Sequence, residues 1–151
     1  MKEIRQLEVR ISGYQEKIQE LEAERRKQEQ NYESLRVFKG NVEISHGEFH
    51  DINNWRKNTL AELQTVEANS IIAQRYRDGM NYILNGIASQ IIGCVYPALF
   101  FEISVKMQKY INEINNCDVE ISRYRNLIEN AEAELEKAKK EENNRRNGGN
   151  R

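Results

Sequence analysis

IRQLEVRISGYQEKIQEL, residues 4–21, places an apolar residue at every third or fourth position. The spacing continues to residue 35, with polar residues at 25 and 28. This first heptad pattern comprises Ile4, Leu7, Ile11, Tyr14, Ile18, Leu21, Arg25, Gln28, Tyr32 and Leu35. Alternating steps of three and four align these positions on one side of an α-helix, and such a side must be buried against other helices. The stretch therefore predicts a protein organised by helix packing.

A second heptad pattern lies near the other end of the chain, beginning with MQKYINEINNCDVEISRYRNLI at residues 107–128. It comprises Met107, Tyr110, Ile114, Cys117, Ile121, Tyr124, Ile128, Ala131, Leu135 and Ala138. Ile111 and Leu127 lie beside it and widen the apolar side of the helix beyond what one neighbour would bury. We therefore expect this helix to contact two neighbours, with another protein as a candidate for one of them.

The composition favours long helices over a compact globule. The chain has 151 residues, of which 38% are hydrophobic and 31% charged, with a single proline. The net charge is -1, and both signs are interleaved along the chain. Nucleic-acid-binding domains concentrate basic residues on one face, so this balance does not favour a nucleic-acid partner.

Glycine, proline and capping signals predict where the helices end. Gly40 is placed as the C-terminal cap of the first helix, and Ser45 with Glu48 has the spacing of a capping box for the second. Asn53 or Asn54 is a later alternative start of the second helix. Gly93 followed by Pro97 predicts a break, with Pro97 opening a third helix. Expected helices are 2–38, 46–92 and 97–142.

The fold class that follows is all-α, an elongated antiparallel helical bundle of three long helices with coiled-coil seams. Residues 1–142 form a single domain, and residues 143–151 form a disordered polar tail. One alternative stays open, in which the second and third helices are a single long helix kinked at Pro97.

Arg25 and Gln28 interrupt the first heptad pattern at adjacent core positions. One interpretation is that the helix face opens to solvent there. The other is a buried polar layer, which weakens packing while it fixes register or selects a partner.

Residues 83–101, ILNGIASQIIGCVYPALFF, form the most apolar segment. A membrane-spanning helix needs about 20 predominantly apolar residues, and this segment contains Asn85, Gln90 and Pro97, so membrane insertion is not favoured. The expectation is a buried helix end, with a patch for a partner or a membrane surface as the alternatives.

Catalytic and metal-binding patterns are weak. His46 and His50 are four residues apart, but their order differs from the metalloprotease motif and the chain has no third histidine. No phosphate-binding glycine loop and no recognisable nucleophile signature occur. Cys94 and Cys117 suggest buried thiols in a reducing cytoplasm, and the N-terminus lacks the apolar region of a secretory signal peptide. We expect no enzyme activity, no cofactor and no metal.

Trp55, the only tryptophan, lies in the polar sequence DINNWRKN just after the expected first bend. Large aromatic residues at such a bend pack into the end of a helical hairpin or anchor a partner protein. The sequence leaves both roles open.

The long N-terminal helix, a Trp-x-Gly-like bend at Trp55-Arg56-Lys57 and the long C-terminal helical region resemble the small helical proteins associated with type VII secretion in Gram-positive bacteria. Among these, the chain is most similar to YwqH-like proteins encoded beside LXG polymorphic toxins. Lys57 replaces the glycine of the Trp-x-Gly pattern. Ile128 stands where the export signal of relatives has an acidic residue four positions after the tyrosine, here Tyr124.

The resemblance implies a non-enzymatic targeting chaperone that binds the helical N-terminal region of an LXG toxin. Such a protein would be cytoplasmic and exported, if at all, with its partner by type VII secretion. The residues expected to bind the partner are Trp55, Ile91, Ile111, Ile114, Ile121, Leu127 and Ile128. The alternative function is a homo-oligomeric coiled-coil scaffold or a prefoldin-like holdase.

Overall fold

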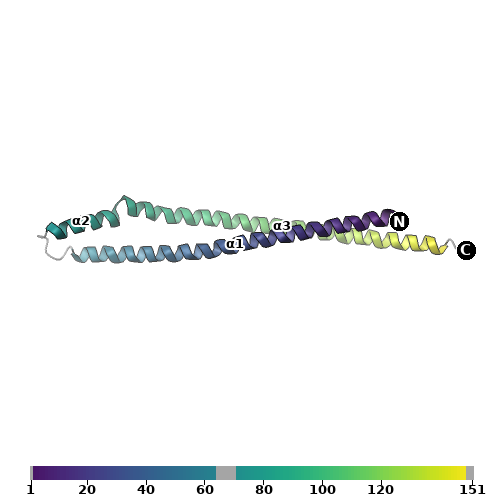
Figure 1. Cartoon of the computed structure of the whole chain (residues 1–151), viewed down its shortest axis with the longest axis horizontal. Helices are drawn as coiled ribbons and strands as arrows, with labels where there is room; N and C mark the ends of the chain where they lie inside the picture. Colours follow the sequence, from purple (N-terminus) through teal and green to yellow (C-terminus); the bar gives the residue numbers. More distant parts are fainter. Residues whose placement is uncertain (1, 64–70, 149–151) are drawn as a thin grey trace. The chain divides into compact units, whose positions relative to one another are not determined.

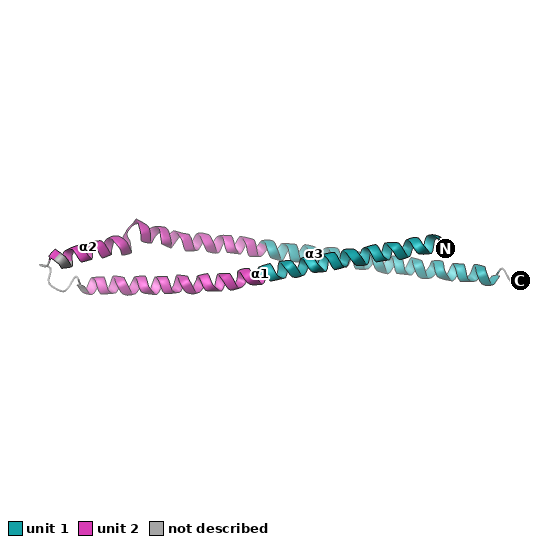
Figure 2. Cartoon of the chain, in the orientation of Figure 1, with its two compact units in different colours: residues 1–32, 109–151 teal, residues 33–108 magenta. Residues whose placement is uncertain are grey.

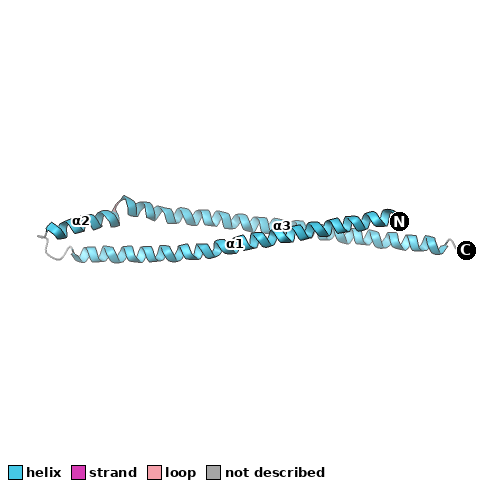
Figure 3. Ribbon diagram, in the orientation of Figure 1, coloured by secondary structure: helices cyan, strands magenta, loops and turns pink. Residues whose placement is uncertain are grey.

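The computed structural model describes residues 2–63 and 71–148. Three helices contain all of these residues except Gly86: α1 spans Lys2–Leu63, α2 spans Ile71–Asn85 and α3 spans Ile87–Gly148 (Figure 1). No strand occurs in the two described ranges (Figure 3). The predicted all-α class is confirmed.

The chain divides into two units, shown in Figure 2. Unit 1 holds residues 1–32 and 109–151, and unit 2 holds residues 33–108. In unit 1, Lys139 Nζ lies 3.6 Å from Glu8 Oε1, and Arg25 Nε lies 2.8 Å from Asp118 Oδ1. As the residue number along α1 rises, the number of its partner on α3 falls, so the two helices of unit 1 are antiparallel.

Unit 2 pairs the second half of α1 with α2 and the first part of α3. The ring of His46 on α1 lies 4.7 Å from that of Tyr96 on α3, between ring centroids. Farther along α1, Leu60 lines the same hollow as Met80 of α2. The pairing within unit 2 is therefore antiparallel as well.

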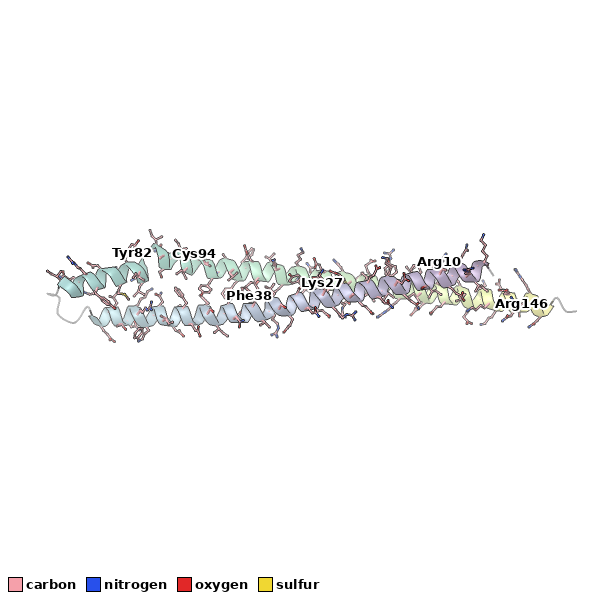
Figure 4. All side chains as sticks on the ribbon, in the orientation of Figure 1. Arg10, Lys27, Phe38, Tyr82, Cys94 and Arg146 are labelled. Carbon is pink, nitrogen blue, oxygen red and sulfur yellow. The ribbon has the colours of Figure 1, made fainter. Side chains whose placement is uncertain are left out.

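The two heptad patterns supply the packed side of each long helix. Every residue of both patterns is buried or half-buried, and Tyr14 contacts Tyr124 with ring centroids 5.8 Å apart. Burying an isoleucine or leucine side chain stabilises a fold by about 1.5–3 kcal/mol, so the buried Leu7, Ile11 and Ile121 contribute much of the stability of unit 1. Within each unit, side chains meet between the paired helices and the others project away (Figure 4). The predicted packed faces are confirmed.

The prediction of three long helices is wrong, because the described residues form two long helices, α1 and α3, and the short α2 joins α3 at a bend. Helix α1 continues through Gly40 and through the Ser45–Glu48 capping box. Gly40 adopts no left-handed backbone conformation, as a glycine cap would. A glycine inside a helix lowers stability by about 1 kcal/mol relative to alanine. The burial of the neighbouring Val42 side chain more than offsets this loss.

The bend lies at Gly86, between α2 and α3, and not at Gly93 and Pro97. A Cβ atom at position 86 would collide with the backbone carbonyl oxygen of Tyr82, so only glycine fits this position. The Gly86 carbonyl accepts a hydrogen bond from the Gln90 amide at 3.2 Å, which begins the hydrogen bonding of α3. Pro97 is an interior residue of α3 and does not open a helix.

Pro97→Ala is expected to raise the free energy of unfolding by about 2 kcal/mol, since proline in a helix interior costs about 3 kcal/mol relative to alanine and part of that cost is relieved locally. Alanine restores an amide that can bond the carbonyl of Gly93, four residues earlier. Urea unfolding followed by circular dichroism measures the gain. Gly93→Ala is the matched control, with an expected gain of about 1 kcal/mol because its new Cβ meets no neighbour. A Pro97→Ala protein less stable than the parent would contradict the prediction.

The C-terminal boundary also differs from the prediction. Residues 143–148 belong to α3, where a disordered tail was expected. An ion pair between Arg146 and Glu142, 2.8 Å apart and four residues from each other, supports the last turns of the helix. Residues 64–70, which the prediction placed inside the second helix, lie outside the described residues.

Candidate interaction surface

Exposed large hydrophobic side chains are concentrated in unit 2. Of those in the described residues, all except Val9 and Val119 belong to this unit. A pair of helices encloses only one side of each, so apolar residues on the other sides remain in solvent. Unit 2 is therefore the candidate interaction surface, because monomeric proteins rarely leave large apolar patches uncovered.

The first part of this surface is the outer stripe of α1, which we define as Val37, Ile44, Ile52 and Trp55, all exposed. Val37 and Ile44 each follow a packed residue, Leu35 and Val42, by two positions. Two positions correspond to about 200° around a helix, so the stripe points away from the packed side. Trp55 is the largest member, and 66% of its surface is exposed.

The second part is the outer stripe of α3, which we define as Ile87, Ile91, Cys94, Ala98, Phe101 and Val105. All six are exposed and follow one another in steps of four and three. Cys94 and Ala98 lie two positions on either side of Tyr96, whose ring contacts α1, so this stripe also faces away from the packed side.

Two hollows in unit 2 lie beside these stripes, and each is lined by residues of a stripe and of a neighbouring helix. One, of about 370 Å³, is lined by Leu35 and Phe38 of α1 and by α3 residues that include Phe101 and Val105. The other, of about 350 Å³, lies beside Trp55 and is completed by Tyr76, Met80 and Ile83 of α2, among others. Both are mostly apolar and suited to large side chains of a partner.

The residues expected to bind a partner fall into two groups. Trp55 and Ile91 are exposed on the outer stripes of unit 2, and 58% of the surface of Ile91 is accessible. The other five belong to unit 1: Ile121 is buried, and the half-buried residues are Ile111, Ile114, Leu127 and Ile128. The sequence prediction did not include Val37, Ile44 or Phe101, although the steps of three and four from Ile87 to Val105 were visible in the sequence.

The polar layer in the first heptad pattern is buried at Gln28, which is 8% exposed. Its Nε2 donates a hydrogen bond to Glu24, while its buried Oε1 has no hydrogen-bond partner. Arg25 is half-buried, and its Nε forms an ion pair with Asp118 at 2.8 Å without the angle of a hydrogen bond. The solvent interpretation is therefore wrong for Gln28.

Gln28→Leu is expected to raise the free energy of unfolding by about 1 kcal/mol, because it removes a buried oxygen whose hydrogen bonding is unsatisfied. If the polar layer also selects the pairing of the helices, the same variant will populate additional oligomers. Thermal unfolding measures the first effect and light scattering the second. Gln30→Leu, an exposed position on the same helix, is the control. A less stable Gln28→Leu protein would show that the hydrogen bond from Gln28 to Glu24 stabilises the fold by more than the burial of the unpaired Oε1 destabilises it.

The histidines and cysteines form no recognisable site. His46 packs against Tyr96 and Phe100, and His50 lies 3.1 Å from the side-chain amide of Asn54. Residues 2–63 and 71–148 contain no group of three or more side chains placed to bind a metal ion. Cys117 is buried, and this burial, with the nearby Glu24 carboxylate, raises the pKa of its thiol. Cys94 is exposed, contrary to the expectation of two buried thiols.

One helical stretch, Gln74–Gly148, contains an 18-residue window with a mean hydropathy of 1.5. Length and composition alone would allow it to cross a membrane, and 6% of the window is buried within the chain. A single helix of this kind is weak evidence of membrane insertion. The expectation that the chain does not insert stays a prediction.

Comparisons with protein-family models, curated proteins and solved structures gave no match to this chain. The resemblance to YwqH-like proteins therefore stays a hypothesis.

Proposed function

We propose that the chain is a non-enzymatic helical partner protein, which binds a helix of another protein along the outer stripe of α1. The observation that carries this proposal is the exposure of Val37, Ile44, Ile52 and Trp55 on one helix. An amphipathic helix that packs along such a stripe would bury apolar surface, and each Å² buried stabilises the complex by about 25 cal/mol. The complex would thus gain stability that the isolated chain lacks.

Charged residues beside the stripe would give this binding specificity. Glu48, Asp51 and Arg56 lie within a turn of Ile52 or Trp55. Charges that flank an apolar seam set the partner and its orientation in coiled coils, since a mismatched partner brings like charges together. A dedicated helical partner suits this arrangement better than a variety of clients.

The partner that we propose is the helical N-terminal region of a type VII-secreted LXG toxin. Trp55 itself and the pairing of α1 with a second long helix support this choice. The bend expected at Trp55-Arg56-Lys57 is absent, because α1 continues through these residues to Leu63. In this role the chain is a cytoplasmic targeting chaperone, which keeps the toxin's helices soluble and accompanies them to the secretion machinery. The departures at Lys57 and Ile128 favour recognition of the complex over export of the free chain.

Co-expression with the helical N-terminal region of a co-encoded LXG toxin tests the proposal. Light scattering after size-exclusion chromatography should show one complex of fixed stoichiometry, and the toxin segment alone should aggregate or be degraded. The matched control is the toxin's C-terminal domain, which should not bind. Separate elution of the chain and the helical segment would refute the proposal.

A homo-oligomeric scaffold is the second candidate, and the outer stripe of α3 favours it. That stripe is exposed like the stripe on α1, but charged residues are almost absent around it. Prefoldin-like activity has less support, since prefoldins carry β-hairpins between their coils and the described ranges contain helices only.

A further inference from the structure

Most of the outer stripe of α3 lies in an uncharged part of the chain, and only its last turn is flanked by charges, Glu102 and Lys106. From Gly79 to Phe101 there is no aspartate, glutamate, lysine or arginine. A hetero-partner selected by flanking charges, as on α1, would find such groups only at one end of this stripe. Pairing with an identical surface, by contrast, brings no like charges together.

The order of residue sizes along the stripe is self-complementary. Large residues occupy both ends of the stripe, with Ile87 and Ile91 at one end and Phe101 and Val105 at the other. The small residues Cys94 and Ala98 lie at its centre. In an antiparallel pair of such helices, Ile87 meets Val105 of the second copy, Ile91 meets Phe101, and Cys94 meets Ala98. The small central pairs let the two backbones approach closely, as small residues do at other tight helix crossings.

We propose that the outer stripe of α3 binds a second copy of this chain in an antiparallel, two-fold symmetric dimer. The symmetry axis passes close to the level of Tyr96, midway along the stripe. Such an interface is closed, because each copy uses the same surface and none remains for a third. The proposal does not depend on the proposed binding of a toxin helix, which uses α1, and it deepens the second candidate function, the homo-oligomeric scaffold.

A membrane is a less suitable occupant of the same surface. Helices that lie on a membrane carry lysine or arginine beside the apolar face, whereas residues 79–105 contain neither and Lys106 follows only the last residue of the stripe. A spanning helix would remove Tyr96 and Phe100 from their ring contacts with His46 and would place Asn85 and Gln90 in lipid.

The expected dimer is weak. From Ile87 to Val105 the stripe is roughly 27 Å long at 1.5 Å per residue. An interface of this length is at the low end of specific interfaces, below about 1,200 Å², so we expect a dissociation constant on the order of 10 µM.

Sedimentation equilibrium of the full chain from low micromolar to high micromolar concentration tests the dimer. The mass should double across this range, and Ile91→Glu should raise the dissociation constant at least about tenfold. Val105→Lys is a second variant on the same stripe, and both side chains are exposed, so folding should not change. Ile44→Glu, on the outer stripe of α1, is the control and should dimerise like the parent.

Disulfide trapping tests the antiparallel register. In a Cys94→Ser background, Ile87→Cys and Val105→Cys proteins should form a disulfide-linked dimer readily when mixed and poorly when oxidised separately. A chain that is monomeric at all concentrations would overturn the proposal. So would dimerisation that Ile91→Glu and Val105→Lys leave unchanged, or a monomer that co-sediments with phosphatidylcholine and phosphatidylglycerol vesicles through this stripe.

Discussion

Ile121→Asp is expected to lower the free energy of unfolding by at least about 4 kcal/mol, the largest stability effect predicted for the chain. Ile121 is 5% exposed and belongs to the packed side of α3 in unit 1. The substitution removes a buried apolar side chain and places a carboxylate on the packed side of α3. Urea unfolding monitored by circular dichroism of the isolated chain measures the loss.

Val119→Asp is the matched control for this prediction. Val119 lies two residues away on the same helix and is 66% exposed, so its replacement should change the free energy of unfolding by no more than about 0.5 kcal/mol. Equal effects at the two positions would mean that α3 does not pack on α1 in unit 1 as described. A stable Ile121→Asp chain that fails only to bind a partner would assign Ile121 to an intermolecular interface.

The packed faces were predictable from the sequence because helical periodicity is a local property. Leu7 and Ile11 belong to steps of three and four that persist over many turns, and no other regular structure buries such a pattern. The long run of consistent positions outweighs single exceptions such as Gln28. The sequence therefore predicts which side of each helix is covered in unit 1.

Helix ends were not predictable in the same way. Gly40 and Pro97 are each unfavourable in a helix by about 1–3 kcal/mol, a cost that packing along the rest of a long helix exceeds. The bend lies at Gly86, in the dipeptide Asn85-Gly86, which is typical of turns. The apolar sequence on both sides of this dipeptide favoured an uninterrupted helix. Only the close approach of the Tyr82 carbonyl shows why glycine is required there.

The candidate surface was predicted in part. Trp55 and Ile91 were selected from the sequence and are exposed, but the stripe on α1 was missed. Residues 83–101, expected first as a buried helix end and only alternatively as a patch, carry most of the exposed stripe on α3. The reason is that periodicity shows which residues share a side of a helix and not how many helices cover it. Phe101 would lie inside a three-helix bundle, whereas with a single packed neighbour it faces solvent.

Trp55→Ala is expected to weaken binding of the toxin's helical N-terminal region by about 3 kcal/mol, or roughly 150-fold in dissociation constant, since buried tryptophans are the commonest anchors of protein interfaces. Trp55 is exposed on the outer stripe of α1, so its truncation should leave the melting temperature of the free chain nearly unchanged. Isothermal titration calorimetry with the purified toxin segment measures the affinity.

Val9→Ala is the control for Trp55→Ala. Val9 is also an exposed hydrophobic residue of α1, but it belongs to unit 1 and lies outside both outer stripes. Its truncation should leave the affinity within about threefold of the parent, because residues outside an interface core contribute little to binding. If Trp55→Ala binds the toxin segment as tightly as Val9→Ala does, the partner does not use the outer stripe of α1. A large loss in both variants would indicate instead that the partner covers α1 in both units.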